Sequence, residues 1–145
     1  MLKSNILLIL SFLVGTSWLW AQNAPPIKSI QASQKAKISQ TIGIADVKII
    51  YHRPGVKGRE VFGALVPYDQ VWRAGANENS TISFSHPARL GEKEVQAGTY
   101  GLHMIPTEDG NWTMILNEDA HSWGSYFYDQ ERDVVRISGK AVNTK

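Results

Sequence analysis

Apolar side chains recur at every second position along much of this chain, and this period of two constrains the fold more than any other feature. Ile38 and Ile42 alternate with polar residues, and Val47 and Ile49 resume the pattern after Gly43. Successive side chains of a β-strand point to opposite faces, so two alternating runs separated by a glycine predict a β-hairpin.

The same pattern continues towards the C-terminus. Strands are predicted at 81–85, 99–105, 112–116 and 134–137, with polar turns at 91–94 and 108–111. No stretch of ten residues has helical spacing. Short strands separated by turns rich in Gly, Pro and Asn favour an all-β fold, either an antiparallel β-sandwich or an open barrel.

The first 21 residues have the zones of a secretory signal. Lys3 supplies the positive charge, residues 6–14 form the apolar stretch, and Ala21 provides a small residue at the expected cut; cleavage after Ala24 is the alternative. A membrane span needs about 20 apolar residues, so we expect cleavage rather than a retained anchor. The protein is therefore expected in the periplasm or outside the cell.

Composition narrows the possible functions. The chain contains no cysteine, so it is not expected to be a lipoprotein, and its stability must come from a buried core rather than disulfides. A formal net charge of +2 is too small to indicate nucleic-acid binding. The four histidines lack metal-binding spacing, and phosphate-loop and dinucleotide motifs are absent, so no metal and no cofactor are expected.

The mature chain is expected to contain one domain. Residues 22–34 include Pro25 and Pro26 and are predicted to be a flexible lead-in. The β-domain is expected over 35–138, followed by a polar tail at 139–145.

One segment, residues 51–78, departs from the alternating pattern. It contains four glycines and two prolines but also Phe62, Leu65 and Trp72. A long irregular stretch in a compact domain is usually functional or packed on itself. We therefore expect a long, ordered Gly/Arg-rich loop.

This segment resembles an exported bacterial family found mainly in Bacteroidetes and known as domain of unknown function 2911. The matching residues are Tyr51, Arg53-Pro54, Lys57-Gly58-Arg59, Phe62-Gly63, Leu65–Tyr68, Val71-Trp72-Arg73, Gly75–Glu78, Ala97–Tyr100, Trp112, Asn117, Trp123-Gly124 and Tyr126. The resemblance implies an exported β-sandwich-like domain without an assigned reaction. Similar members continue with further strands, so the resemblance implies either a C-terminally truncated domain, with an exposed strand edge, or a divergent member of the family.

Two interpretations of the basic residues in the segment remain open. The cations are Arg53, Lys57, Arg59 and Arg73. They could form an anion-binding patch, with guanidinium groups gripping a carboxylate or phosphate. Alternatively, they bind loop carbonyls and the acids Glu60, Asp69 and Glu78, and so lock the segment. Arg53 continues the face of Val47 and Ile49, so we expect it to be partly buried.

Other candidate residues are weaker. Glu78, next to Asn77, could act with His103 as a general acid and base, but His103 is predicted on the strand face opposite Leu102, where a satisfied or exposed histidine is the simpler interpretation. Trp123 and Tyr126 could be a stacking platform for sugar rings or part of the core, whereas Trp112 is expected in the core.

We therefore expect a non-catalytic domain that binds a polar small molecule, a glycan or a cell-envelope protein. The predicted ligand-binding residues are Arg53, Lys57, Arg59, Arg73, Asn77, Glu78, Trp123 and Tyr126. The alternatives are a hydrolase that uses Glu78 and His103, and a purely structural accessory module.

The export signal gives the first testable prediction. Protein recovered from the periplasm or medium of an expressing bacterium should begin at Gln22, or at Pro25 if the later bond is cut. Intact-mass spectrometry distinguishes the two. A mass that still includes residues 1–21 would contradict cleavage.

Overall fold

Almost all the regular structure is antiparallel β-strand, as the alternation predicts. The computed structural model describes residues 29–142, and the chain from Gln31 onward forms one compact unit. The predicted signal, at 1–21, and most of the lead-in lie outside the described residues. The strands are β1 (Gln34–Ile42), β2 (Ala45–Arg53), β3 (Trp72–Arg73), β4 (Ser80–Phe84), β5 (Ala88–Leu90), β6 (Lys93–Val95), β7 (Gly98–Ile105), β8 (Asn111–Asn117) and β9 (Asp133–Lys140).

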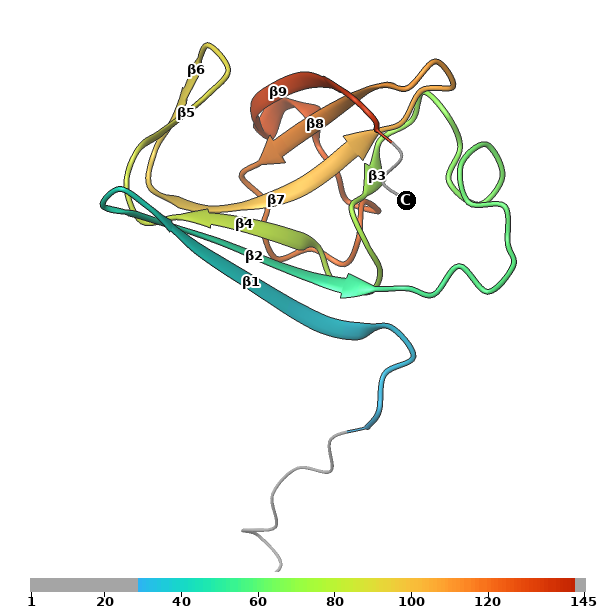
Figure 1. The fold of residues 1–145 in the computed structure, drawn as a ribbon. Helices are drawn as coiled ribbons and strands as arrows, with labels where there is room; N and C mark the ends of the chain where they lie inside the picture. The colour runs from blue at the N-terminus through green and yellow to red at the C-terminus, as the bar shows by residue number, and fades with distance from the viewer. Residues whose placement is uncertain (1–28, 143–145) are drawn as a thin grey trace, which may run out of the picture. The chain divides into compact units, whose positions relative to one another are not determined.

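Seven of these strands form one strongly twisted sheet (Figure 1). Its order is β1-β2-β4-β7-β8-β9, and β3 pairs with β7 beyond the end of β4. The β5–β6 hairpin is a separate two-stranded sheet, and a 3-10 turn, η2 (Gln130–Arg132), precedes β9. The seven-stranded sheet does not close into a barrel, because β1 and β9 stand at its two ends. The all-β prediction is thus confirmed in its open, sandwich-like form.

One face of the sheet carries the apolar core. Its buried residues come from five strands: Ile82, Phe84, Val95, Leu102, Leu116 and Val135. Strand register lines them up, since Leu102 pairs with Leu116 and Leu116 pairs with Val135. Ile82 and Phe84, from the strand predicted at 81–85, both point into this core.

The opposite face of β7 and β8 is buried as well, although it is not uniformly apolar. His103 pairs with Ile115 and Gly101 pairs with Asn117 on this face, and all four are buried. The loop that follows β8, residues 118–128, covers them. The carbonyl of Asp119 lies so close to Gly101 that a Cβ at that position would overlap it. Gly101 therefore allows loop and sheet to meet.

Burial decreases steadily towards β1. Val47 and Ile49 of β2 are only half-buried, and every residue of β1 except Ala36 is exposed. The expectation that Arg53 is partly buried is wrong, because its face of β2 is no longer covered at that end of the strand. The neighbouring His52 points to the other face and is buried.

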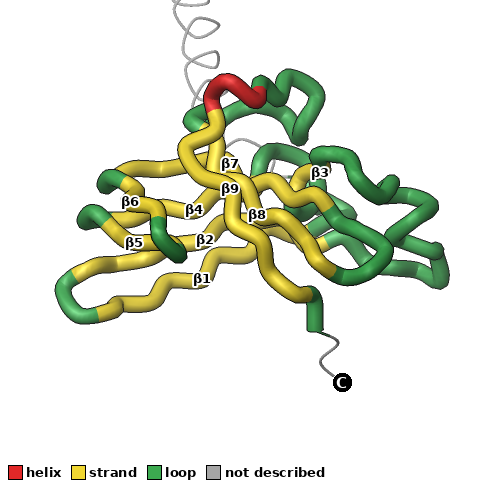
Figure 2. The backbone as a smooth tube through the Cα atoms, turned by 90° about the horizontal axis from the view of Figure 1, so that it is seen from above, coloured by secondary structure: helices red, strands yellow, loops and turns green. Residues whose placement is uncertain are grey.

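β9 extends to Lys140, so Gly139 and Lys140, which the sequence places in a polar tail, belong to the last strand. Figure 2 shows β8 and β9 together with the 51–78 segment, which projects from the sheet on the side of β3. Within residues 29–142, no helix is long and apolar enough to cross a membrane.

Burial on both faces of β8 gives a stability prediction. Ile115 and Leu116 are adjacent, point to opposite faces and are both fully buried. Replacing either by alanine should lower the free energy of unfolding by about 2–5 kcal/mol, as measured by urea denaturation. The matched control is Ile44→Ala, because Ile44 is 82% exposed. A large loss from Leu116→Ala alone would show that the loop does not seal the second face.

Candidate functional site

The 51–78 segment is held by its own backbone hydrogen bonds. The Val66 amide donates to the Val61 carbonyl at 2.7 Å, and the Gly63 amide donates to the Val66 carbonyl at 2.9 Å. The Asp69 amide donates to the Pro106 carbonyl at 2.9 Å, which ties the segment to the end of β7. These bonds satisfy polar backbone groups that lie outside the strand ladders, so the loop is ordered, as expected.

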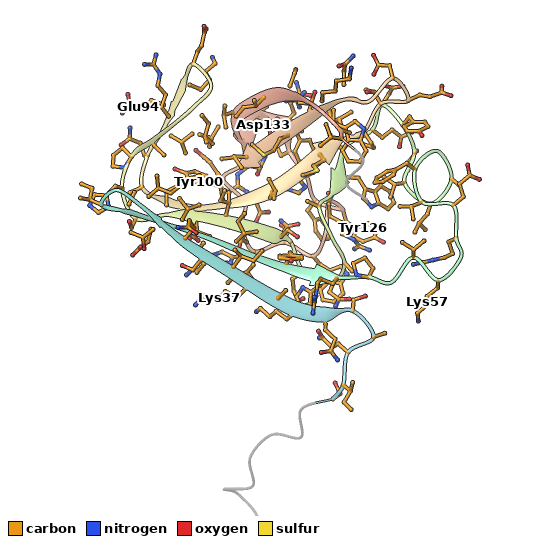
Figure 3. The ribbon with its side chains drawn as sticks, viewed as in Figure 1. Lys37, Lys57, Glu94, Tyr100, Tyr126 and Asp133 are labelled. Atoms are coloured by element: carbon orange, nitrogen blue, oxygen red, sulfur yellow. The ribbon has the colours of Figure 1, made fainter. Side chains whose placement is uncertain are left out.

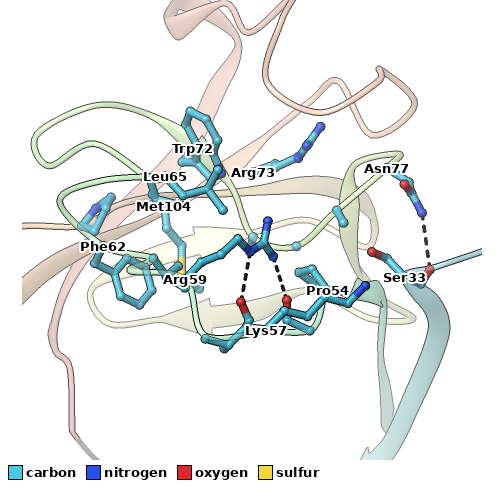
Figure 4. A pocket seen from close by; sticks show the side chains of 18 of the residues that line it. Ser33, Pro54, Lys57, Arg59, Phe62, Leu65, Trp72, Arg73, Asn77 and Met104 are labelled. Atoms are coloured by element: carbon cyan, nitrogen blue, oxygen red, sulfur yellow. Dashed lines mark hydrogen bonds between the residues drawn. The ribbon is translucent and has the colours of Figure 1, made fainter.

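Between this segment and the sheet lies a pocket of about 760 Å³, which we call the loop pocket (Figure 4). Its apolar walls include Phe62 and Leu65 of the segment, together with Trp72 of β3, Met104 of β7 and Trp112 of β8. The rings of Phe62 and Trp112 meet edge to face, with centroids 4.6 Å apart. Small-molecule sites are typically apolar clefts of about 300–1,000 Å³, and the loop pocket fits this description.

The charged side chains that line the loop pocket are Lys57, Arg59 and Arg73, and all three are cationic. Arg59 Nε donates to the Val56 carbonyl at 3.0 Å, and its Nη2 donates to the Gly55 carbonyl at 2.7 Å (Figure 4). Two carbonyls thus fix the guanidinium plane while its Nη1 has no hydrogen-bond partner among residues 29–142. Within the same residues, none of the three cations belongs to an ion pair.

Two lining residues adopt left-handed backbone conformations. Lys57 has φ 51° and Asn77 has φ 59°. Asparagine enters this region readily, whereas lysine rarely does, and such strain costs about 1–3 kcal/mol and concentrates at functional sites. The Asn77 side chain also donates to the carbonyl of Ser33 at 3.4 Å, so the residues just before β1 form part of the pocket wall.

The loop pocket gathers four of the eight predicted ligand-binding residues: Lys57, Arg59, Arg73 and Asn77. Arg53 and Glu78 do not line it. Arg53 is exposed, and the carboxylate of Glu78 lies 3.4 Å from Nε2 of buried His52. The proposed locking role of the arginines holds in part, because Arg59 binds loop carbonyls, but no ion pair in residues 29–142 joins Arg59 to Glu60 or Glu78.

The three cations are also less clustered than the sequence suggests. In Figure 4 the side chain of Arg73 extends away from Arg59. It lies against Gly124 of the covering loop, where an added Cβ would come within 2.7 Å of Arg73 Nη1. Arg59 and Lys57 are therefore the cations best placed to meet a ligand.

His103 takes part in a separate polar cluster beneath the covering loop. Its Nδ1 shares a hydrogen bond of 2.8 Å with the Ser125 hydroxyl, and its ring meets the edge of Tyr128. The Tyr128 hydroxyl donates to Asp133 at 2.6 Å and accepts from Arg136 at 2.8 Å. Burial raises the pKa of Tyr128 to about 12. His103 is thus a buried histidine whose Nδ1 pairs with Ser125, whereas Glu78 pairs with His52.

The covering loop is stiffened by Asp119, which accepts bonds from the amides of His121 and Ser122 and from the Ser122 hydroxyl. These bonds, the Ser122 hydroxyl first, lower the pKa of Asp119. Trp123 and Tyr126 point outward, with Tyr126 76% exposed. They belong neither to the core nor to the loop pocket.

Sequence reasoning missed part of the pocket. Trp112 is expected in the core from the sequence, yet it forms a half-buried wall of the pocket, as does Met104 of β7. Ser33 was expected in the flexible lead-in. One signal in the sequence could have indicated these pocket walls: Trp72 and Trp112 both belong to the residues that resemble the family. Among residues 29–142, no group of three or more His, Asp or Glu side chains is placed to hold a metal ion.

The buried His103 predicts a pH dependence of stability. Desolvation lowers its pKa from 6.5, and the carboxylates of Asp133 and Asp119 only partly oppose this shift. As pH falls below 6.5, His103 therefore binds a proton in the unfolded chain before it does so in the folded protein, and the free energy of unfolding decreases. Melting temperature should fall from about pH 7.5 to about pH 5.5, and His103→Gln should flatten that slope. His86→Gln, at an exposed site, should leave it unchanged; an unaltered slope in His103→Gln would contradict the assignment.

Comparison with known proteins shows which family the chain belongs to. A search of curated proteins and a search of solved structures find no match to this chain. A family model described as "Protein of unknown function (DUF2911)" matches residues 33–145, which include the core strands, the covering loop and every residue that lines the loop pocket except Ala32. The match covers well over half of the chain and agrees with the resemblance noted in its sequence. The chain therefore belongs to the DUF2911 family.

Proposed function

We propose that this domain binds a small amphipathic anion in the loop pocket. The observation that carries the proposal is the composition of the lining, in which apolar walls are combined with charged side chains of one sign. Apolar walls select a ligand with a hydrocarbon or ring portion, since burial of apolar surface drives its association. The cations select a carboxylate or phosphate at its polar end.

Arg59 is the residue that we assign to the anionic group. Its guanidinium is already held by the carbonyls of Gly55 and Val56, so little side-chain entropy is lost when a ligand binds. An anion moved into an apolar pocket loses its hydration, and only a paired cation offsets that loss. Lys57 lies two residues away and adds a second positive charge at the same wall.

The sequence-based expectation of a polar ligand is thereby made more specific. A wholly polar molecule would find few hydrogen-bond partners over most of the pocket surface, because that surface is formed by apolar side chains such as Phe62, Leu65 and Trp72. An amphipathic ligand uses both kinds of wall. With the export signal at residues 1–21, we further propose that the ligand is met in the periplasm or outside the cell.

A pair of chemically matched probes tests this proposal. Decanoate and decanol share an alkyl chain and differ in charge, and Trp72 and Trp112 of the pocket provide a fluorescence signal. Decanoate should bind more tightly than decanol. Arg59→Ala should weaken decanoate binding by roughly tenfold or more, because a hydrogen bond to a charged group is worth about 1.5–3 kcal/mol, and should leave decanol binding nearly unchanged.

The matched control is Arg53→Ala, which removes an exposed arginine of the same segment outside the pocket. It should alter neither titration. Thermal melts of both variants confirm that they are folded. Equal weakening of decanoate and decanol by Arg59→Ala, or no binding of either probe to the unmodified protein, would contradict the proposal.

A further inference from the structure

The covering loop brings a serine hydroxyl onto a buried histidine ring. Ser125 Oγ lies 2.8 Å from Nδ1 of His103, which comes from β7 and is only 2% exposed, whereas Ser125 is half-buried. Nε2 of the same ring and the carbonyl oxygen of Asp119 both lie against Gly101. A carbonyl oxygen near Nε2 favours a proton on that nitrogen, so the Ser125 hydroxyl donates to Nδ1. In this geometry a histidine can accept the proton of a serine nucleophile.

An arginine side chain lies beside this pair. Arg73 is directly opposite His103 where β3 pairs with β7, and opposite side chains of an antiparallel pair share one face of the sheet. Arg73 also lies against Gly124, the residue before Ser125. Among residues 29–142, its Nε has no hydrogen-bond partner and no ion pair includes its guanidinium. A guanidinium in this position can stabilise a negative charge that develops on an oxygen next to Ser125.

Aromatic side chains flank Ser125 at the surface. Trp123 is 52% exposed and Tyr126 is 76% exposed. Figure 3 shows Tyr126 near β3, the strand that carries Arg73 and meets the covering loop at Gly124. Because hydrogen bonds to Asp119 stiffen this loop, its aromatic rings are held in place and can contact a ring-shaped or apolar group.

We propose that Ser125 and His103 form a catalytic pair that hydrolyses small carboxylic esters with a ring-shaped or apolar group. Ser125 Oγ adds to the ester carbonyl carbon while His103 Nδ1 takes its proton, and Arg73 stabilises the oxyanion. The carbonyl then re-forms, the bond to the alkoxy oxygen breaks, and the proton on Nδ1 passes to the departing alcohol. Water attacks the acyl-serine, its proton passes through His103 to Ser125 Oγ, and the carboxylic acid is released.

A second serine–histidine hydrogen bond among the described residues provides an internal comparison. Ser85 Oγ lies 2.9 Å from Nδ1 of His86, but both residues are exposed. Desolvation lowers the pKa of His103, so its ring is unprotonated at neutral pH and can act as a base. The carboxylates of Asp133 and Asp119 favour the charged ring that the reaction creates. Burial therefore distinguishes His103 from the solvent-exposed His86.

A fluorophosphonate probe tests the nucleophile, because a serine activated by a base displaces fluoride from the phosphorus atom of the probe. Mass spectrometry of the digested protein should find the adduct on Ser125 and not on Ser85. His103→Gln should slow this labelling by roughly 100-fold, the smaller end of what a general base contributes. An unlabelled Ser125, or equal labelling of both serines, would overturn the proposal.

Hydrolysis of p-nitrophenyl acetate tests turnover. Ser125→Ala should reduce the rate to the level of the reaction without protein, whereas the matched control Ser85→Ala should leave it unchanged. Tyr126→Ala should raise KM for this aromatic ester and change kcat little, since it removes a contact with the ring. Thermal melts show whether each variant is folded. A rate that is unaffected by Ser125→Ala would show that Ser125 is not the nucleophile and would overturn the proposal.

Discussion

The close approach of the Asp119 carbonyl to Gly101 is the contact on which much of this structure depends. It allows the covering loop to lie directly on β7, so that the second face of the sheet is sealed around His103 and Ile115. Gly124 of the same loop lies against Arg73 in β3. β3 also contains Trp72, which lines the loop pocket. The covering loop, on the opposite face of the sheet, therefore helps to fix the position of this pocket wall.

The sequence predicted the fold well where burial follows local chemistry. Alternation identified β4, β7 and β8 because the core face of each is apolar, as at Ile82 and Leu116. It could not identify β3, which is two residues long and pairs with β7 only because the chain has been brought there by tertiary packing. Alternation also placed Arg53 on a covered face. It shows which residues share a face of a strand, but not at which residue the packing against that face ends.

The candidate site was located but not resolved by sequence. Density of glycine and arginine marked residues 51–78, and Lys57 and Arg59 do line a pocket. The apolar half of that pocket comes from β7 and β8, whose Met104 and Trp112 are indistinguishable from core residues in a one-dimensional pattern. Long-range positions of this kind follow from strand register and loop anchoring, such as the bond from Asp69 to Pro106. Local sequence periodicity contains neither.

The loop pocket and the exposed edge strand β1 share a structural element. Ser33 lines the loop pocket, accepts the bond from Asn77 and immediately precedes β1. The position of the start of β1 therefore also sets the position of the pocket wall at Ser33. A wall ordered in advance lowers the entropy lost on binding.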